Sequence, residues 1–181
     1  PGAMDEILLQ NAVTMTVAAH QEKNAIIVEV QLLNDLTGHH VPTDSPLRHL
    51  ILVVKASQHD EDLQLIDGPV LPDWTGVGDP AQGYFAGLPG KSYAKILRET
   101  WTGVIPSGAY WKPTHIESDN RLAAFETDSS RYKFVNPPQG TVDIVVELWF
   151  RRAFIELMEQ KGWDTPDILM ENESIELQIS P

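Results

Sequence analysis

Apolar and polar residues alternate along much of the chain, which is the pattern of β-strands with one buried face. Two such segments lie near the N-terminus, with apolar residues at Val13, Met15, Val17 and Ala19 and then at Ile26, Val28, Val30 and Leu32. The residues between them, 21–24, are polar and predict a turn. The two segments are therefore expected to form a hairpin.

Later segments extend this pattern. Leu50–Val54 is a short, continuous apolar run, which predicts a central strand covered on both sides. The longest alternation runs from Val142 to Phe150, with Asp143, Glu147 and Arg151 on its polar face, and a similar pattern covers 175–179. Weaker runs lie at 63–66, 93–97, 122–126 and 132–135. With about seven to nine strands, the expected fold is all-β, an immunoglobulin-like antiparallel β-sandwich.

Two segments depart from the strand pattern. Ala153–Lys161 has apolar residues at helical spacing and Gly162 at its stop position, so one short helix is expected there. Asp67–Gly90 is rich in Gly, Pro and Asp and includes Trp74 and Tyr84. We interpret it as a long ordered loop over one end of the sandwich.

The length of 181 residues suits one domain with a real hydrophobic core. The first residues, Pro1–Met4, have the composition of a cloning remnant. We expect one β-sandwich domain over 5–181, with native sequence that begins near Asp5 inside a longer gene product. No run approaches 18 apolar residues, so membrane insertion is not expected.

Charge and cysteine content exclude several classes of function. The 26 acidic and 13 basic side chains give a net charge of −13, which disfavours nucleic acid and anionic lipid as partners. The chain has no cysteine, which excludes disulfides, thiolate zinc sites, cysteine nucleophiles and covalent haem attachment through Cys-x-x-Cys-His. Signatures of hydrolases, metalloproteases and phosphate-binding loops are also absent, so the residues indicate no catalytic site.

Three of the six histidines lie in the segment 34–49, between two expected strands. Successive residues of an extended chain point to opposite faces, so His39 and His40 do not readily chelate one ion together. A metal such as zinc or copper would need a third ligand from His115, Asp44 or Asp119. Alternatively, the glycine and prolines of this segment shape a crossover in which one histidine donates to a backbone carbonyl.

Two further groups of charged residues are candidates. Asp119 and Arg121, together with Arg48, are suited to a structural ion pair that closes one end of the sandwich. The acidic residues around 60–62 and 73–79 have oxygen ligands for calcium, but their spacing fits no EF-hand loop.

Several short motifs occur together and in order: Thr37–Thr43 with the following Arg48, Tyr84–Leu97, Ser118–Leu122 and Leu148–Ala153. In this combination the chain resembles the β-sandwich domain found beside multihaem c-type cytochromes of bacterial envelopes. The resemblance spans roughly residues 30 to 170. The haems of such proteins lie in a neighbouring region rich in Cys-x-x-Cys-His, a motif that this chain lacks.

The resemblance implies a non-catalytic, exported module, periplasmic or extracellular, that docks on a haem-bearing domain or cytochrome subunit. It implies no haem in this chain, although His39 or His40 could ligate a haem iron of the neighbour.

Two other functions remain as alternatives. One is a metal-binding protein or metal-dependent enzyme that uses His39 or His40 with His115 and Asp119. The other is a surface carbohydrate-binding or adhesion domain with an exposed aromatic platform drawn from Trp74, Tyr84, Trp101, Tyr110 and Trp111.

Overall fold

A computed structural model of the chain describes residues 5–180. The expected cloning remnant, 1–4, lies outside the described residues. The helices are α1 (Glu6–Gln10) and α2 (Ile155–Lys161), and two 3-10 turns are η2 (Asp73–Thr75) and η3 (Pro80–Gln82). The strands are β1 (Thr14–Glu22), β2 (Ala25–Leu33), β3 (His49–Gln58), β4 (Glu61–Asp62), β5 (Leu65–Asp67), β6 (Gly90–Glu99), β7 (Thr114–Asp119), β8 (Thr127–Val135), β9 (Gly140–Arg151) and β10 (Ile168–Ile179).

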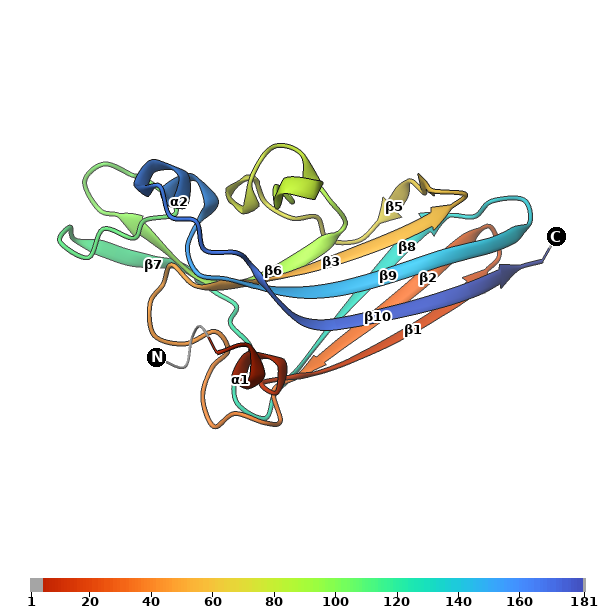
Figure 1. Cartoon of the computed structure of the whole chain (residues 1–181), viewed down its shortest axis with the longest axis horizontal. Coiled ribbons are helices and arrows are strands. Elements are labelled where there is room, and N and C mark those ends of the chain that lie inside the picture. The colour runs from red at the N-terminus through yellow and green to blue at the C-terminus, as the bar shows by residue number, and fades with distance from the viewer. Residues whose placement is uncertain (1–4, 181) are drawn as a thin grey trace.

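The strands form two antiparallel sheets that face each other (Figure 1). One sheet has the order β1-β2-β8-β5, and the other has the order β10-β9-β3-β6-β7 with β4 added to β3. The prediction of an all-β sandwich is confirmed, with ten strands in the described residues where about seven to nine were expected. None of the helices among residues 5–180 has the length and apolar character needed to cross a bilayer.

The predicted N-terminal hairpin is the β1–β2 pair. Its register places Val17 opposite Val30, and the turn lies at Lys23 and Asn24. Lys23 has a positive φ of 54°, which two-residue hairpin turns require because their twist must match that of the strands. The predicted hairpin is confirmed, and its turn is shorter than the polar run 21–24, because Gln21 and Glu22 still pair within β1.

The main core fills the space between the sheets. Strand β3 turns Leu50, Leu52 and Val54 toward it, and all three are fully buried. The alternate residues Ile51 and Val53 are also buried, on the outer face of the same sheet. The prediction that this strand is covered on both sides is thus confirmed, because a third layer lies outside the six-stranded sheet.

This outer layer consists of α2 and the segment 68–89, which includes η2 and η3 (Figure 1). Leu71 and Phe85 from the segment pack on Ile51 and Val53, and Trp149 of β9 joins them. The segment was expected over one end of the sandwich, but it covers the face of a sheet. The continuous apolar run of β3 needs a cover on its outer side, and this segment provides it.

Several elements differ from the sequence prediction, including the two-residue β4, which was not expected, and β10, which begins well before the expected 175–179. The run 122–126 is not a strand, since Leu122 makes one isolated bridge to Val41 and Phe125 has a φ of 62°. Strand β7 was not predicted, because it is an exposed edge strand without an apolar face. Helix α1 was also missed, although Asp5 caps it by accepting from the amides of Ile7 and Leu8.

One flank of the sandwich is closed by its first and last strands. Strands β1 and β10 run beside each other, each from a different sheet (Figure 1). Gln21 Nε2 donates to the carbonyl of Ser180 at 3.1 Å, and the amide of Ser180 donates back to Gln21 Oε1 at 3.2 Å.

Candidate functional site

The histidine segment 34–48 is folded around the side chain of Asn34, which is fully buried. Its Nδ2 donates to the carbonyl of His39 at 2.8 Å and to that of Leu122 at 3.1 Å. Its Oδ1 accepts from the hydroxyl of Thr37 at 2.6 Å. One amide side chain therefore joins the histidine turn to the segment after β7.

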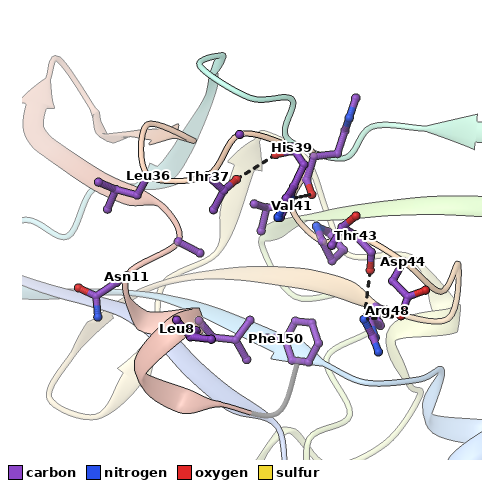
Figure 2. Close-up of a pocket in the computed structure, with 15 residues that line it drawn as sticks. Leu8, Asn11, Leu36, Thr37, His39, Val41, Thr43, Asp44, Arg48 and Phe150 are labelled. Atoms are coloured by element: carbon purple, nitrogen blue, oxygen red, sulfur yellow. Dashed lines mark hydrogen bonds and ion pairs between the residues drawn. The ribbon is translucent and has the colours of Figure 1, made fainter. Parts of the chain in front are cut away.

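A cavity of about 620 Å³ opens between this segment and α1 (Figure 2). Apolar side chains from three parts of the chain line it, including Leu8 of α1, Leu36 and Phe150 of β9. Its polar lining comes mainly from His39, His40, Thr43, Asp44 and Arg48. The cavity thus combines an apolar wall with imidazole and guanidinium groups, within the size range of ligand sites.

The ring of His39 is held by the backbone beside it. Its Nδ1 lies 3.0 Å from the carbonyl oxygen of His40. A carbonyl only accepts, so Nδ1 bears the proton and the neutral ring keeps a free lone pair on Nε2. This is the form in which imidazole binds a metal or haem iron. His39 and His40 are both exposed.

The charged residues near the histidines form two separate ion pairs. Arg121 makes a bidentate pair with Asp119, with Nε and Nη2 at 2.8 and 2.7 Å from the two carboxylate oxygens. Arg48 pairs with Asp44 instead, at 3.1 Å. The Arg121 guanidinium holds the pKa of Asp119 below its ordinary value, and His40 acts in the same direction. Asp119 is therefore ionised and occupied by Arg121.

His115 lies away from the other proposed metal ligands. It pairs with Arg98 of β6, whereas Asp119 pairs with Lys95, three residues away on that strand, which places the two Cα atoms about 10 Å apart. Its closest acidic neighbour is Glu117, at 3.8 Å. Among residues 5–180, no three His, Asp or Glu side chains gather in an arrangement that could hold a metal ion. The metal site with His39, His40, His115 and Asp119 stays a prediction.

His49, the first residue of β3, follows this segment and lies in a different environment. It is fully buried beneath the outer layer, where its ring stacks on Phe154 with centroids 5.1 Å apart and meets the edge of Trp74 at 5.2 Å. Its Nδ1 is 3.0 Å from the carbonyl oxygen of Leu47, and its Nε2 has no partner. Burial lowers the pKa of His49 to about 3, and the nearby charge of Arg151 adds to this effect.

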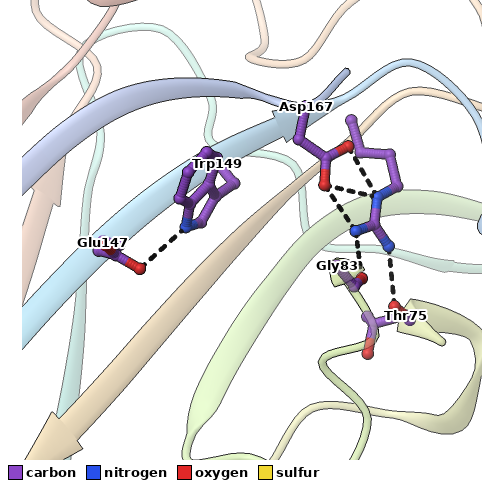
Figure 3. Close-up of polar contacts among 6 residues, drawn as sticks. Thr75, Gly83, Glu147, Trp149 and Asp167 are labelled. Atoms are coloured by element: carbon purple, nitrogen blue, oxygen red, sulfur yellow. Dashed lines mark hydrogen bonds and ion pairs between the residues drawn. The ribbon is translucent and has the colours of Figure 1, made fainter. Parts of the chain in front are cut away.

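Arg151, expected on the polar face of its strand, is also buried beneath the outer layer. Its guanidinium donates to the carbonyls of Thr75 and Gly83, at 2.8 and 2.5 Å. It also forms a bidentate pair with Asp167, at 2.9 and 2.6 Å (Figure 3). One side chain thus fastens the segment 68–89 and the β9–β10 connection to the sheet.

The aromatic residues considered as a platform divide into two groups. Trp74 packs on His49 and Phe154, and Tyr84 donates its hydroxyl to Glu159 of α2. Trp101, Tyr110 and Trp111 are exposed at 82%, 93% and 68%. The rings of Tyr110 and Trp111 are 5.0 Å apart and nearly perpendicular, so they do not form a coplanar pair.

Comparison with known proteins identifies a structural neighbour. No protein-family model matches the chain. No curated protein matches its sequence. The fold is similar to that of a penta-heme cytochrome c552 from Thermochromatium tepidum, with a TM-score of 0.70 and 20% sequence identity. The alignment covers 97% of this chain and 42% of the cytochrome chain. At 20% identity the likeness shows the fold alone. The fold of this chain corresponds to less than half of the cytochrome chain.

Proposed function

We propose that the chain is a non-catalytic docking module of an exported multihaem cytochrome-type electron-transfer protein, and that it packs on a haem-bearing domain or subunit. The observation that supports this most directly is the unequal coverage of the structural match. Nearly the whole chain aligns with 42% of a cytochrome whose name states five haems. This chain has no cysteine for covalent haem attachment, so in this proposal the haems belong to the partner.

The surface beside the histidine cavity is suited to such a contact. Leu8 and Leu36 line the cavity and are each 58% exposed. Ile7, the neighbour of Leu8 in α1, is 72% exposed. Grouped apolar side chains at a surface indicate an interface more often than isolated ones do. The net charge of −13 favours a partner whose facing surface is basic.

The histidine turn gives this contact a specific chemistry. The ring of His39 is held through Nδ1, so Nε2 is the nitrogen that faces a ligand. In the proposed complex His39 or His40 supplies an axial ligand to a haem iron of the partner. The location is periplasmic or extracellular, where c-type cytochromes of bacterial envelopes reside.

The experiment is a calorimetric titration of this chain with the haem-bearing region that the same gene or an adjacent gene encodes. We expect a one-to-one complex with a Kd of about 1 μM or tighter. Leu8→Asp and Leu36→Asp should each weaken it by about tenfold or more, because they bury a charge in the contact. Val77→Asp is the matched control, since Val77 is 75% exposed and lies outside the cavity.

The role of the histidines is measured separately by the Soret band. Complex formation should shift the band of the partner, and His39→Ala or His40→Ala should abolish the shift while docking persists. Absence of any complex with the wild-type chain would refute the docking proposal. A complex without a spectral shift would refute only the ligand role.

A further inference from the structure

A second cavity, separate from the histidine cavity, lies between the β6–β7 connection and the end of α2. Its volume is about 630 Å³, within the range of about 300–1,000 Å³ that small-ligand sites occupy. We call it the aromatic groove, because Trp74, Tyr110, Trp111, Phe154 and Trp163 line it. The two cavities share no lining residue.

Three of these aromatic side chains are exposed to solvent. Tyr110, Trp111 and Trp163 keep 93%, 68% and 42% of their surface accessible. Side chains of this size are usually buried, and exposing several together is unfavourable unless they bind something. Burial of the main core does not explain their positions, because Tyr110 and Trp111 lie in a connection that extends beyond it.

The connection 100–113 is held in place by one buried carboxylate. Glu99 is 4% exposed and accepts from Lys112 at 2.7 Å, from Ser107 at 3.1 Å and from the Thr102 hydroxyl. Its amide also donates to the carbonyl of Val104 at 3.0 Å. A loop fixed in this way loses little conformational entropy when a ligand binds, so its aromatic rings are preorganised.

Two ring contacts shape the groove. Tyr110 and Trp111 are nearly perpendicular, at 86°, and so form a corner. The guanidinium of Arg152 lies 5.7 Å from the centre of the Trp163 ring, over one of its faces. A ligand that fits this groove needs a flat apolar face about the size of one aromatic ring.

The polar lining indicates an uncharged ligand. The charged side chains of the groove are Glu99 and Glu156, and Lys112 and Lys161, so two negative and two positive charges cancel. This balance contrasts with the net charge of −13 of the chain. Lys161 can donate to hydroxyl groups, Glu156 can accept from them, and the amide of Gln160 can do both.

A sugar ring combines these properties, with an apolar C–H face and a rim of hydroxyl groups. We propose that the aromatic groove binds an uncharged oligosaccharide, with a sugar ring held in the corner between Trp111 and Tyr110 and its hydroxyl groups bonded to Gln160, Lys161 and Glu156. The proposal is independent of docking to a haem-bearing partner, since it uses other residues.

The test is isothermal titration of the chain with cellotetraose, maltotetraose and chitotetraose, each to about 10 mM. We expect at least one of them to bind with a Kd of about 10 μM to 1 mM. Trp111→Ala and Tyr110→Ala should each weaken that binding by about tenfold or more. Both side chains are exposed, so these substitutions leave the core intact.

Phe125→Ala is the matched control, because Phe125 is 73% exposed and lies outside the groove. It should bind as the wild type does. The proposal is overturned if none of the three oligosaccharides binds, or if Trp111→Ala binds unchanged. It is equally overturned if sugars do not bind and the chain instead self-associates in a way that Trp111→Ala abolishes, since the groove would then be a protein contact.

Discussion

The Arg151 side chain is 2% exposed while its partner Asp167 keeps 17%, so the ion pair joins a buried cation to a carboxylate that still reaches water. Partial hydration of Asp167 lowers the desolvation cost that a fully buried pair would have. The carbonyls of Thr75 and Gly83 complete the coordination of the guanidinium. The outer layer is therefore fixed to the sheet by polar bonds as well as by apolar packing.

Substitution of this arginine should loosen the outer layer. Arg151→Met removes the cation and leaves Asp167 and the carbonyl of Gly83 without donors, so we expect the free energy of unfolding to fall by about 3 to 5 kcal/mol. Urea denaturation measures this, and limited proteolysis should show faster cleavage in 68–89. Arg131→Met is the control, since its pairs are about half exposed and worth about 0.5 kcal/mol. A loss as small as that of the control would contradict the structural role of Arg151.

The buried His49 should make stability fall in mild acid. Its folded pKa is about 3 against an ordinary value of 6.5, so as the pH falls the unfolded chain takes up the proton first. The free energy of unfolding should decrease by about 1.4 kcal/mol per pH unit between pH 6.5 and 3 from this group.

The contribution of His49 can be isolated by comparison. His49→Phe keeps an aromatic ring in the stack but has no titration, so from pH 6.5 to 4.5 it should lose about 2 to 3 kcal/mol less than the wild type. His115→Gln, at a site 55% exposed, should follow the wild type. Urea titrations of the three proteins at each pH measure these losses. If the free energy of unfolding of His49→Phe fell with pH as steeply as that of the wild type, the imidazole would be protonated in the folded chain.

Asn34 should govern the order of the histidine segment. Asn34→Ala removes the three hydrogen bonds of a fully buried side chain, so the free energy of unfolding should fall by about 2 to 4 kcal/mol, at about 1 kcal/mol for each bond. Thr37→Ala removes the bonds of a partly exposed hydroxyl to Asn34 and to the His39 carbonyl, and should cost about 1 kcal/mol. Chemical denaturation compares the two, and equal losses would indicate that the bonds from Asn34 to His39 and Leu122 contribute nothing.

Glu99 should control the rigidity of the aromatic connection. Glu99→Gln removes the charge that binds Lys112, so amide hydrogen exchange in 100–112 should become about tenfold faster or more. Glu22→Gln, which weakens an exposed pair with Arg131 on the other sheet, is the control and should leave those amides unchanged. Hydrogen exchange read by NMR gives the comparison.

The pH dependence of the same connection follows from Glu99. The bonds from Lys112 and Thr102 hold the pKa of its carboxyl below the ordinary value. The bonds are therefore complete above pH 4.5 and are lost as the pH falls through the lowered pKa. Exchange in 100–112 should be constant from pH 7 to 5 after correction for intrinsic rates, and a rise in that window would contradict the lowered pKa.

The sequence predicted the parts of the fold that rest on period-two burial. The β1–β2 hairpin, the doubly covered β3 and the long β9 all have clear apolar patterns, and α2 has a glycine stop. Strand β7 has no such pattern, because an edge strand exposed on both faces buries nothing. The run that begins at Leu122 was wrongly predicted to be a strand. A short apolar run is compatible with a buried turn as well as with a strand.

The polar residues were harder to place, because hydrogen bonding between distant segments has no sequence period. Arg151 and Asp167 are 16 residues apart and meet only through the β9–β10 connection. The alternation of β9 put Arg151 on the polar face correctly, but that face is covered by a segment whose position the sequence left open. Asn34 and His49 were seen only as polar members of a histidine-rich segment, whose buried centre depends on the crossing of two loops.

The meeting of β1 and β10 has a consequence for how the protein tolerates crowding. An unpaired flank is a template for strand addition by other molecules, and these two strands shield each other from it. Among the described strands, the outermost ones on the other side are β5, three residues long and irregular in register, and β7, which bears Glu117 and Asp119. Short or charged borders oppose strand addition, so growth of a continuous sheet from copy to copy is disfavoured at both sides of the sandwich.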